Sequence, residues 1–407
     1  MNHVIYNITQ PAARGGVKFD PSDGSAVIDI RHAYNDAMTD SNDLQYPYSK
    51  HPQPGHTKEV APGVRWLTMP MPGSLSHINL YLLEDHDGWY VVDTGLGNEE
   101  TTEWWQAIFA NELNGKPVVG VICTHMHPDH IGQASMITNQ FRCPLYMTRA
   151  EYYQARTFFT AGGARDSDWI GQTFYTRAGM PEDYLEQLAK MWSQRSADGM
   201  SMPSMPSGFE RLEDGQVLSI GEHDWQVVVG SGHSPEHACL YCAALKIMIS
   251  GDQILPIITS NVSVHPNEPN ANPLKHWMES HDKFLSTPDD TFVLPAHNLP
   301  FYGVRERLRG LISHHEDRML AVEEACVEPQ VAKDLLPVLF ARELDSRQMM
   351  MALGEAIAHV HLLMHRNRIG RSLHEDGRYR FHSIDPDLER RARPNAHDAP
   401  GDGPVRV

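Results

Sequence analysis

Cysteine is scarce in this sequence, which has five cysteines among 407 residues, an odd number without regular spacing. Secreted disulfide-bonded domains show the opposite pattern, so a disulfide framework is not expected. Long apolar runs are also missing, because no segment approaches the roughly 18 consecutive apolar residues of a membrane-spanning helix. Residues 1–20 lack the positively charged start and the apolar stretch of a signal peptide. We therefore expect a cytoplasmic protein with no membrane partner.

Basic residues are also fewer than acidic ones. The chain has 52 acidic and 34 basic residues, a formal net charge of −18. The excess lies in residues 1–300, where 35 acidic residues face 18 basic ones, whereas residues 301–407 have 17 and 16. The electrostatic field of this negative net charge repels a phosphate backbone, so nucleic acid is not an expected partner. Hydrophobic residues still make up 41% of the chain, enough for a sizeable core.

The distribution of residue types predicts four segments. Polar residues with scattered Gly and Pro indicate an irregular N-terminal arm over residues 1–60. Short β-rich runs begin at Val64 and alternate with helical patterns, which predicts an α/β domain over residues 61–302, with a helical insertion or lid at 150–208. Residues 385–407 are rich in Arg, Asp and Pro, and we expect a flexible tail there.

The remaining segment, residues 303–384, has a mainly helical pattern. It predicts helices over Val304–Ala325, Ala332–Phe340 and Ser346–His365. A β-hairpin is expected over Ile369–Phe381, where an Asp-Gly pair tolerates the positive φ of a tight turn. Three helices and a hairpin indicate a winged-helix-like domain.

The strongest chemical signal follows an apolar run and reads Thr-His-Met-His-Pro-Asp-His, ending at His130. Residues two apart in an extended chain face the same way, so His125 and His127 can present imidazoles to one ion. Pro128 disfavours a helical backbone at His127 and can open a helix, which places Asp129 and His130 where they can reach a second ion. Four ligand-type side chains so close together are costly to bury without a cation.

Three further candidate ligands follow apolar strand patterns in turns of small residues. They are His233 after Ser-Gly, Asp252 after Ser-Gly, and His297 after Pro-Ala. With the first group they make five histidines and two aspartates, a set that suits a site for two metal ions.

In these motifs the sequence resembles the metallo-β-lactamase-fold hydrolases. The His-x-His-x-Asp-His block, the Gly-His, the Gly-Asp and the Ala-His occur in that family's order, after an upstream Val-Asp-Thr-Gly at residues 92–95. The resemblance covers about residues 64–300. It implies that residues 61–302 are the catalytic domain of an α/β (α+β) protein, a four-layer αββα sandwich with two metal ions at one edge.

The resemblance also implies a division of the ligands between the two metals. His125, His127 and His233 would bind one metal, Asp129, His130 and His297 the other, and Asp252 would bridge them. Ligand sets of His and Asp suit zinc, iron and manganese alike. The expected cofactors are two divalent metal ions, with zinc preferred over iron and manganese.

Within the family, the sequence resembles the type II glyoxalases, which are hydroxyacylglutathione hydrolases. The true β-lactamases use a cysteine as a second-metal ligand where this chain has Asp252, so antibiotic hydrolysis is not expected. The segment 303–384 resembles the winged-helix extension of some members, both thioesterase-like and ribonuclease-like.

The expected function is hydrolysis of an ester-type bond in a small molecule. A thioester is the preferred substrate class, and a lactone is the next. A hydroxide between the two metals would attack the carbonyl, and Asp129 would pass a proton to the leaving group. The alternative is a metal-dependent ribonuclease or phosphodiesterase. Arginines cluster around the predicted hairpin and favour it: Arg366, Arg368, Arg371, Arg378 and Arg380.

A third alternative is a binding or dimerisation module with structural metals. The complete ligand set argues against it, because a structural metal site is closed and holds one metal. Whether the chain forms a homodimer is left open.

Asp93 is expected to orient a ligand histidine through its far nitrogen. His237 is a candidate for a similar role or for a substrate contact. For His314 and His315, a packing or solvated role is favoured over a substrate role.

Overall fold

The computed structural model describes most of the chain between residues 44 and 384. The described ranges are 44–73, 75–160, 169–187, 204–341 and 344–384, together with two paired strands, β1 (Val17–Phe19) and β2 (Ala26–Ile28). Most of the predicted arm, much of the predicted insertion and the whole predicted tail lie outside these residues. The predicted segment boundaries therefore stay predictions.

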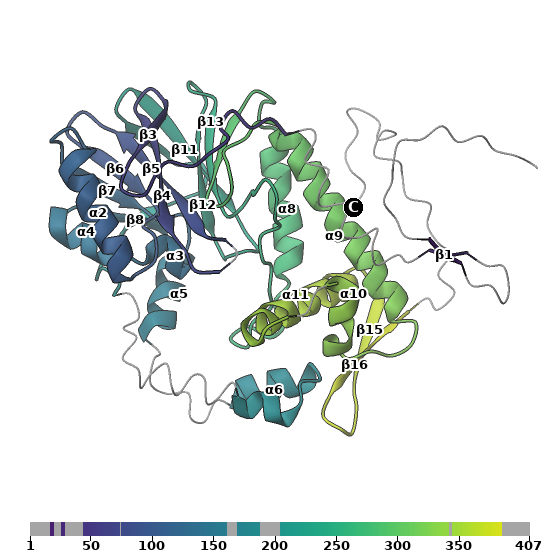
Figure 1. Ribbon diagram of the computed structural model, residues 1–407. Coiled ribbons are helices and arrows are strands. Elements are labelled where there is room, and N and C mark those ends of the chain that lie inside the picture. Colours follow the sequence, from purple (N-terminus) through teal and green to yellow (C-terminus); the bar gives the residue numbers. More distant parts are fainter. Residues whose placement is uncertain are drawn as a thin grey trace, which may run out of the picture.

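Two mixed β-sheets form the centre of the molecule (Figure 1). The first has seven strands in chain order: β3 (Lys58–Ala61), β4 (Val64–Pro70), β5 (His77–Glu84), β6 (Trp89–Val92), β7 (Val118–Ile122), β8 (Leu145–Thr148) and β9 (Glu210–Leu212). The second has five: β10 (Val217–Ile220), β11 (His223–Gly230), β12 (His237–Cys242), β13 (Ile247–Gly251) and β14 (Phe292–Pro295). Pairing is antiparallel from β3 to β6 and from β10 to β13, and parallel from β6 to β9 and between β13 and β14.

Both faces of the sheets are buried along their central strands, which explains why these strands are apolar almost throughout. Successive side chains of a strand point to opposite faces. Trp66 accordingly packs between the two sheets, in a cluster with Trp225 of the second sheet, whereas the neighbouring Leu67 faces the outer helices, in a cluster with Trp105. Burying both faces of both sheets requires helices on the two outer sides.

Helices cover the outer faces, which completes the αββα sandwich that the sequence predicts (Figure 1). The first sheet is covered by α2 (Glu99–Asn111), α4 (Ala134–Phe141) and α5 (Arg149–Thr160). The second is covered by α8 (Pro273–Leu285) and α9 (Val304–Ala325). The carboxyl ends of β6, β7, β11, β13 and β14 gather at one edge of the sandwich, where loops can bring polar side chains together.

The C-terminal elements match the predicted ones closely. The first and third predicted helices are α9 and α11 (Ser346–His365). The second is divided into a 3₁₀ turn, η2 (Ala332–Leu335), and a short α10 (Leu336–Leu339), with Pro337 in the first turn of α10, where its missing N–H is tolerated. The short α6 (Trp169–Arg177) lies beside the C-terminal hairpin, because the Arg177 guanidinium stacks over the Tyr379 ring.

The hairpin consists of β15 (Ile369–Leu373) and β16 (Tyr379–Ser383). Leu373 pairs with Tyr379, which leaves five residues between the strands, and these include the Asp-Gly pair of the predicted tight turn. Only Gly377 of that pair takes a positive φ, 74°. Within the described part of the chain, no helix is both long and apolar enough to cross a membrane.

Candidate metal centre

The motif that ends at His130 lies directly after β7. His127 has an extended backbone, with φ −66° and ψ 148°, and the next residue, Pro128, begins a short helix, α3 (Pro128–Ile131). The sequence predicts this geometry from the proline. The extended stretch points two imidazoles into the site, and the helical turn then places Asp129 and His130 beside them.

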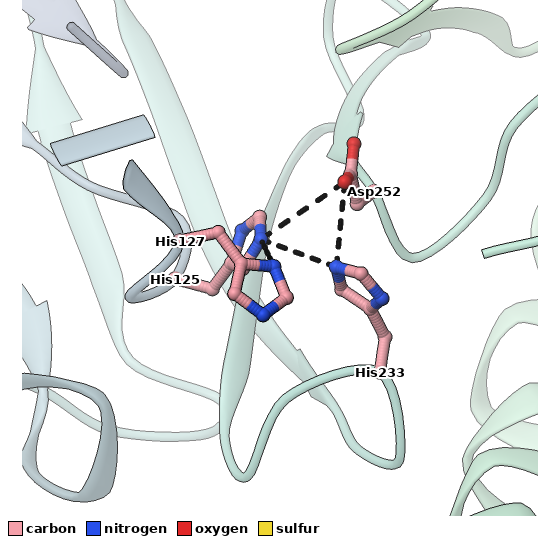
Figure 2. Close-up of side chains that lie close together, drawn as sticks. All are labelled: His125, His127, His233 and Asp252. Atoms are coloured by element: carbon pink, nitrogen blue, oxygen red, sulfur yellow. Dashed lines mark hydrogen bonds and ion pairs between the residues drawn. The ribbon is translucent and has the colours of Figure 1, made fainter. Parts of the chain in front are cut away.

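The structure brings all seven candidate ligands to the same edge of the sandwich, in two groups. The first group holds His125, His127, His233 and Asp252, with ligand atoms that all lie within 4.8 Å of one another (Figure 2). His125 Nε2 is 2.8 Å from His127 Nδ1 and 3.2 Å from His233 Nε2. Three nitrogens and a carboxylate oxygen thus surround one point.

The second group holds Asp129, His130 and His297, again with ligand atoms within 4.8 Å of one another. Asp129 Oδ2 lies 3.6 Å from His130 Nε2 and 3.5 Å from His297 Nε2. Asp252 faces both groups, because Oδ2 is 3.3 Å from His233 Nε2 and Oδ1 is 3.4 Å from His297 Nε2. A carboxylate in this position can bridge two cations.

Three of the ligand histidines are oriented by a bond at the nitrogen that faces away from the centre. His130 Nδ1 donates to Asp93 Oδ2 at 2.8 Å, and His233 Nδ1 donates to the carbonyl of Asn261 at 2.8 Å. His297 Nδ1 lies 3.2 Å from the carbonyl of His77. In the neutral ring, a proton on Nδ1 leaves the lone pair on Nε2, so each ring can turn an acceptor towards a cation at the centre.

Two buried atoms of the site show that the residues fit a cation. His130 Nε2 and Asp252 Oδ1 are both buried and have no hydrogen-bond partner. A buried polar atom without a partner costs roughly 1–3 kcal/mol. Divalent cations bind imidazole nitrogen and carboxylate oxygen, which are the atoms that converge here. Residues of this chemistry and placement could hold two divalent metal ions.

Electrostatics sets the protonation of the ligands. Burial lowers the pKa of His125 well below its usual value and lowers the pKa of His127 to about 3, so both rings are neutral at pH 7. Burial also opposes a proton on His130, but the carboxylates of Asp93, Asp129 and Asp252 raise its pKa well above the usual value. A cation that binds Nε2 of His130 must displace this proton, so metal binding at this group should depend on pH.

Asp93 lies at the end of β6 and holds two segments of the site. Besides His130, its carboxylate accepts the backbone N–H of Thr124 at 2.8 Å and the hydroxyl of the same residue at 2.9 Å. Its backbone has a positive φ of 59°, which is uncommon outside glycine. The structure thus places Asp93 behind His130, a candidate ligand.

His237 lies behind the first group and is fully buried. Its Nε2 accepts the backbone N–H of Asp252 at 3.0 Å, and its ring stacks on His125 with centroids 4.7 Å apart. A residue this deeply buried does not contact substrate, so of its two expected roles the structure favours support of the ligands. Gly251 has no room for a Cβ, which would lie 2.6 Å from the His237 ring.

Two supporting residues have no signal in the sequence. Glu151, at the start of α5, is fully buried and accepts the backbone N–H groups of Met126 at 2.9 Å and Glu236 at 2.8 Å. It thereby ties the loop of the first motif to the loop of His233, and burial raises its pKa to about 7. Asn261 holds His233 through its backbone. Both contacts depend on segments far apart in the chain.

Four of the five arginines around the hairpin make side-chain contacts within the protein. Arg366 makes two hydrogen bonds of 2.9 Å to Glu316, Arg368 pairs with Glu323, and Arg380 pairs with Asp376. Arg371 stacks over the Tyr379 ring at 4.4 Å. Three of these arginines are thus paired with carboxylates, which reduces the positive charge that the ribonuclease alternative requires.

His314 and His315 lie within α9. His315 is fully buried between α8 and α11, against Trp277 and His359. This agrees with the favoured packing role.

Comparisons with known proteins agree with the geometry. The family model described as the Metallo-beta-lactamase superfamily matches residues 73–297. A second model, described as the Metallo-beta-lactamase-like C-terminal domain, matches residues 319–384.

Two solved structures resemble this one over most of the chain. A beta-lactamase domain protein from Burkholderia ambifaria is 40% identical, with a TM-score of 0.77, over 84% of this chain and 99% of that one. A metallo-beta-lactamase family protein from Thermus thermophilus is 25% identical, with a TM-score of 0.66, over 80% of this chain and 100% of that one.

Curated relatives match at lower identity. The human protein named acyl-coenzyme A thioesterase MBLAC2 is 22% identical over 203 residues, which are 48% of this chain and 65% of that protein. The probable metallo-hydrolase YqgX of Bacillus subtilis is 21% identical over 234 residues, 58% of this chain and 90% of that protein. The chain spans 48% to 65% of the length of several curated relatives, among them a protein of Aquifex aeolicus.

Proposed function

The chain belongs to the metallo-beta-lactamase superfamily, whose model covers more than half of it, and we propose from this premise that it hydrolyses a thioester with two bound divalent metal ions. The observation that carries the proposal is the division of five histidines and two aspartates into two groups, with Asp252 facing both. This arrangement suits two cations at a short distance from each other. One cation could not use both groups.

Each group of side chains would hold one ion, and bound ions of this kind would supply a nucleophile at neutral pH and polarise the carbonyl of the substrate. The protein fixes their positions through the bonds at the far nitrogens of the histidines. Zinc is the first candidate because imidazole and carboxylate ligands suit it, and iron or manganese would accept the same set.

Asp129 is proposed to move a proton during the reaction. Burial works to raise its pKa, but the neighbouring His130 and His297 bring the pKa below the usual value, so Asp129 is a carboxylate at pH 7. Its side chain is 16% exposed, whereas that of His130 is fully buried, so the carboxylate lies on the open side of the site. From there it can take a proton and deliver it to the leaving group.

The thioester is supported by resemblance. A curated relative is named an acyl-coenzyme A thioesterase, and this chain has an aspartate at residue 252 where the true β-lactamases have a cysteine. A lactone is the second candidate, since the same attack opens a cyclic ester. The ribonuclease alternative is weaker, because the net charge is −18 and four of the five hairpin arginines have acidic or aromatic partners.

One panel of substrates tests the proposal. Metal-loaded protein is assayed on acyl-thioesters of glutathione and of coenzyme A, on simple lactones and on single-stranded RNA, with His127→Ala as the blank. We expect turnover of a thioester that disappears in the blank. Cleavage of RNA alone would contradict the proposal, and so would thioester turnover that survives in His127→Ala.

A further inference from the structure

The loop that follows β13 supports the metal centre at two points. It begins at Asp252, and the hydroxyl of Ser260 donates a hydrogen bond to the carbonyl of Asp252. The next residue, Asn261, accepts the Nδ1 proton of His233 on its backbone carbonyl at 2.8 Å. The direction of the His233 ring therefore depends on where this loop holds the Asn261 carbonyl.

The position of Asn261 is set from the C-terminal helices. Its side-chain amide donates to Glu355 Oε2 at 3.3 Å, and Glu355 lies on α11. The other oxygen of Glu355 accepts from Arg318 Nη1 of α9 at 2.8 Å. A chain of contacts thus runs from α9 through α11 to the loop and on to a candidate ligand.

Backbone contacts hold the same loop against α11 without spare room. Val264 donates its N–H to the carbonyl of Gly354 at 3.0 Å. A Cβ at Gly354 would lie 2.8 Å from the Val264 carbonyl oxygen and 2.8 Å from Ser263 Cβ, so the close approach requires glycine. Ser263 Oγ lies 3.0 Å from the carbonyl of Met351, one turn earlier in α11.

Helix α9 holds the first half of the loop. Arg307 donates from Nε to the carbonyl of Leu255 at 2.6 Å and from Nη2 to the carbonyl of Ile258 at 2.8 Å. Together with Glu355 and Arg318, this guanidinium makes the loop dependent on the segment after residue 303.

The Arg318–Glu355 ion pair is largely buried. The side chains are 16% and 8% exposed, respectively. Exposed pairs contribute little to a fixed geometry, whereas loss of one partner from a buried pair leaves an uncompensated charge. Glu355 therefore has one orientation, and its second oxygen is directed at Asn261.

We propose that Glu355, held by Arg318, is a positioning residue of the metal centre, which fixes the His233 ring through Asn261 and so makes the C-terminal helices part of the site. The inference rests on the proposed function, because it requires that His233 binds a metal ion. It assigns the segment after residue 303 a role in metal binding in addition to any contact with substrate.

The test compares two buried ion pairs of the same region. Glu355→Gln keeps the size of the side chain but cannot accept from both Arg318 and Asn261. Glu323→Gln is the matched control, because Glu323, on α9, is also buried, its side chain 3% exposed, and pairs with Arg368. Metal affinity is measured by titrating zinc and cobalt(II) into chelator-treated protein in competition with a chromogenic chelator. His233→Ala identifies the binding step that belongs to its group.

Loss of a group that supports a ligand costs about 10-fold to 100-fold in metal affinity, and we expect about 10-fold for Glu355→Gln at the His233 step. The cobalt absorption spectrum should change as well. Glu323→Gln should leave the affinity and the spectrum as in the parent, even if it lowers stability to a similar degree. Equal affinities in the two variants would overturn the inference. Absence of two-metal binding in the parent would instead overturn the proposed function.

A second variant covers the case in which Glu355→Gln does not fold. Asn261→Ala removes the side-chain contact and keeps the backbone carbonyl. It should weaken the His233 step to a similar degree, and combining it with Glu355→Gln should add little further loss. Full additivity of the two changes would contradict a shared path to His233.

Discussion

At the scale of single residues, the centre depends on side chains that never bind a metal. Asp93 holds His130 and the backbone of Thr124, and His237 holds the backbone of Asp252. Asp93 has a positive φ, and so does Gly251, which lies against the His237 ring. These residues determine where the lone pairs of the ligands point, so small changes in them should alter metal affinity more than stability.

Asp93→Asn should weaken metal binding at the group of Asp129, His130 and His297. The amide nitrogen cannot accept the protons of His130 and Thr124, so one of these contacts is lost. We expect a decrease in affinity of about 10-fold to 100-fold at one binding step, measured by competition with a chelator. Asp85→Asn is the control, since Asp85 also accepts a backbone N–H, from Gly221, but far from the site. Equal affinity in the two variants would contradict the role of Asp93.

Gly251→Ala should destabilise the protein because the new methyl group meets the His237 ring. Gly115→Ala is the matched control, since Gly115 also has a positive φ, 74° against 50°, but nothing lies within 4 Å of its Cβ position. The control should cost about 1–2 kcal/mol from backbone strain alone. Gly251→Ala should cost about 1–3 kcal/mol more, typical of overpacking, in denaturant unfolding. Equal losses would show that the fit against His237 is unimportant.

At the scale of elements, the contact between α8, α9 and α11 is lined by neutral histidines. Burial lowers the pKa of His281 to about 4 and that of His359 to about 3, and it lowers the pKa of His315 well below the usual value. His359 Nδ1 donates to the carbonyl of Glu355, and its Nε2 lies 3.3 Å from His315 Nδ1. These histidines therefore stay neutral in the folded protein at pH values below 6.5 at which the unfolded chain would protonate them.

The stability of this interface should decrease as the pH falls from 6.5 towards 4. In that range the unfolded chain takes up protons that the folded chain does not, so acid favours unfolding by about 1.4 kcal/mol per pH unit for each fully buried histidine. His359→Gln should remove one such contribution, about 2 kcal/mol at pH 5 relative to pH 7. Urea unfolding of parent and variant at both pH values measures it. An identical pH dependence in the two proteins would contradict the assignment.

The sequence could predict elements and candidate ligands, because both follow from local patterns. Spacing alone places His125 and His127 on one side of an extended chain, and Pro128 starts the next helix. The helix over Ala332–Phe340 is harder to delimit, since a 3₁₀ turn and an α turn have similar patterns. Glu151, Asn261 and Glu355 could not be found, because each acts on a segment 25 to 94 positions away, and no local pattern marks such a pairing.

At the scale of the whole molecule, the sandwich and the C-terminal helices share one hydrophobic core. Cys239, Met248 and Val293 of the second sheet pack in the same cluster as Leu308 of α9 and Leu353 of α11. The segment after residue 303 therefore covers a face of the sheet that would otherwise be apolar and exposed. It also carries the side chains that hold the loop after Asp252.

Truncation after Tyr302 should prevent stable folding of the remaining chain. Removal of α9 and α11 exposes the outer face of the second sheet, which favours aggregation. We expect little soluble protein, with no cooperative thermal transition in circular dichroism. A folded, soluble fragment that binds two metal ions as tightly as the full chain would contradict both the shared core and the role of the C-terminal helices.

On the proposed function, hydrolysis needs two metal ions, one in each group of candidate ligands. The most direct test is the rate of hydrolysis of an acyl-coenzyme A thioester while zinc is added stepwise to chelator-treated protein. We expect no turnover without metal, a rise in rate that continues until two equivalents are bound, and no turnover of His127→Ala at any zinc concentration. Full activity at one equivalent, or activity without metal, would contradict the proposed function.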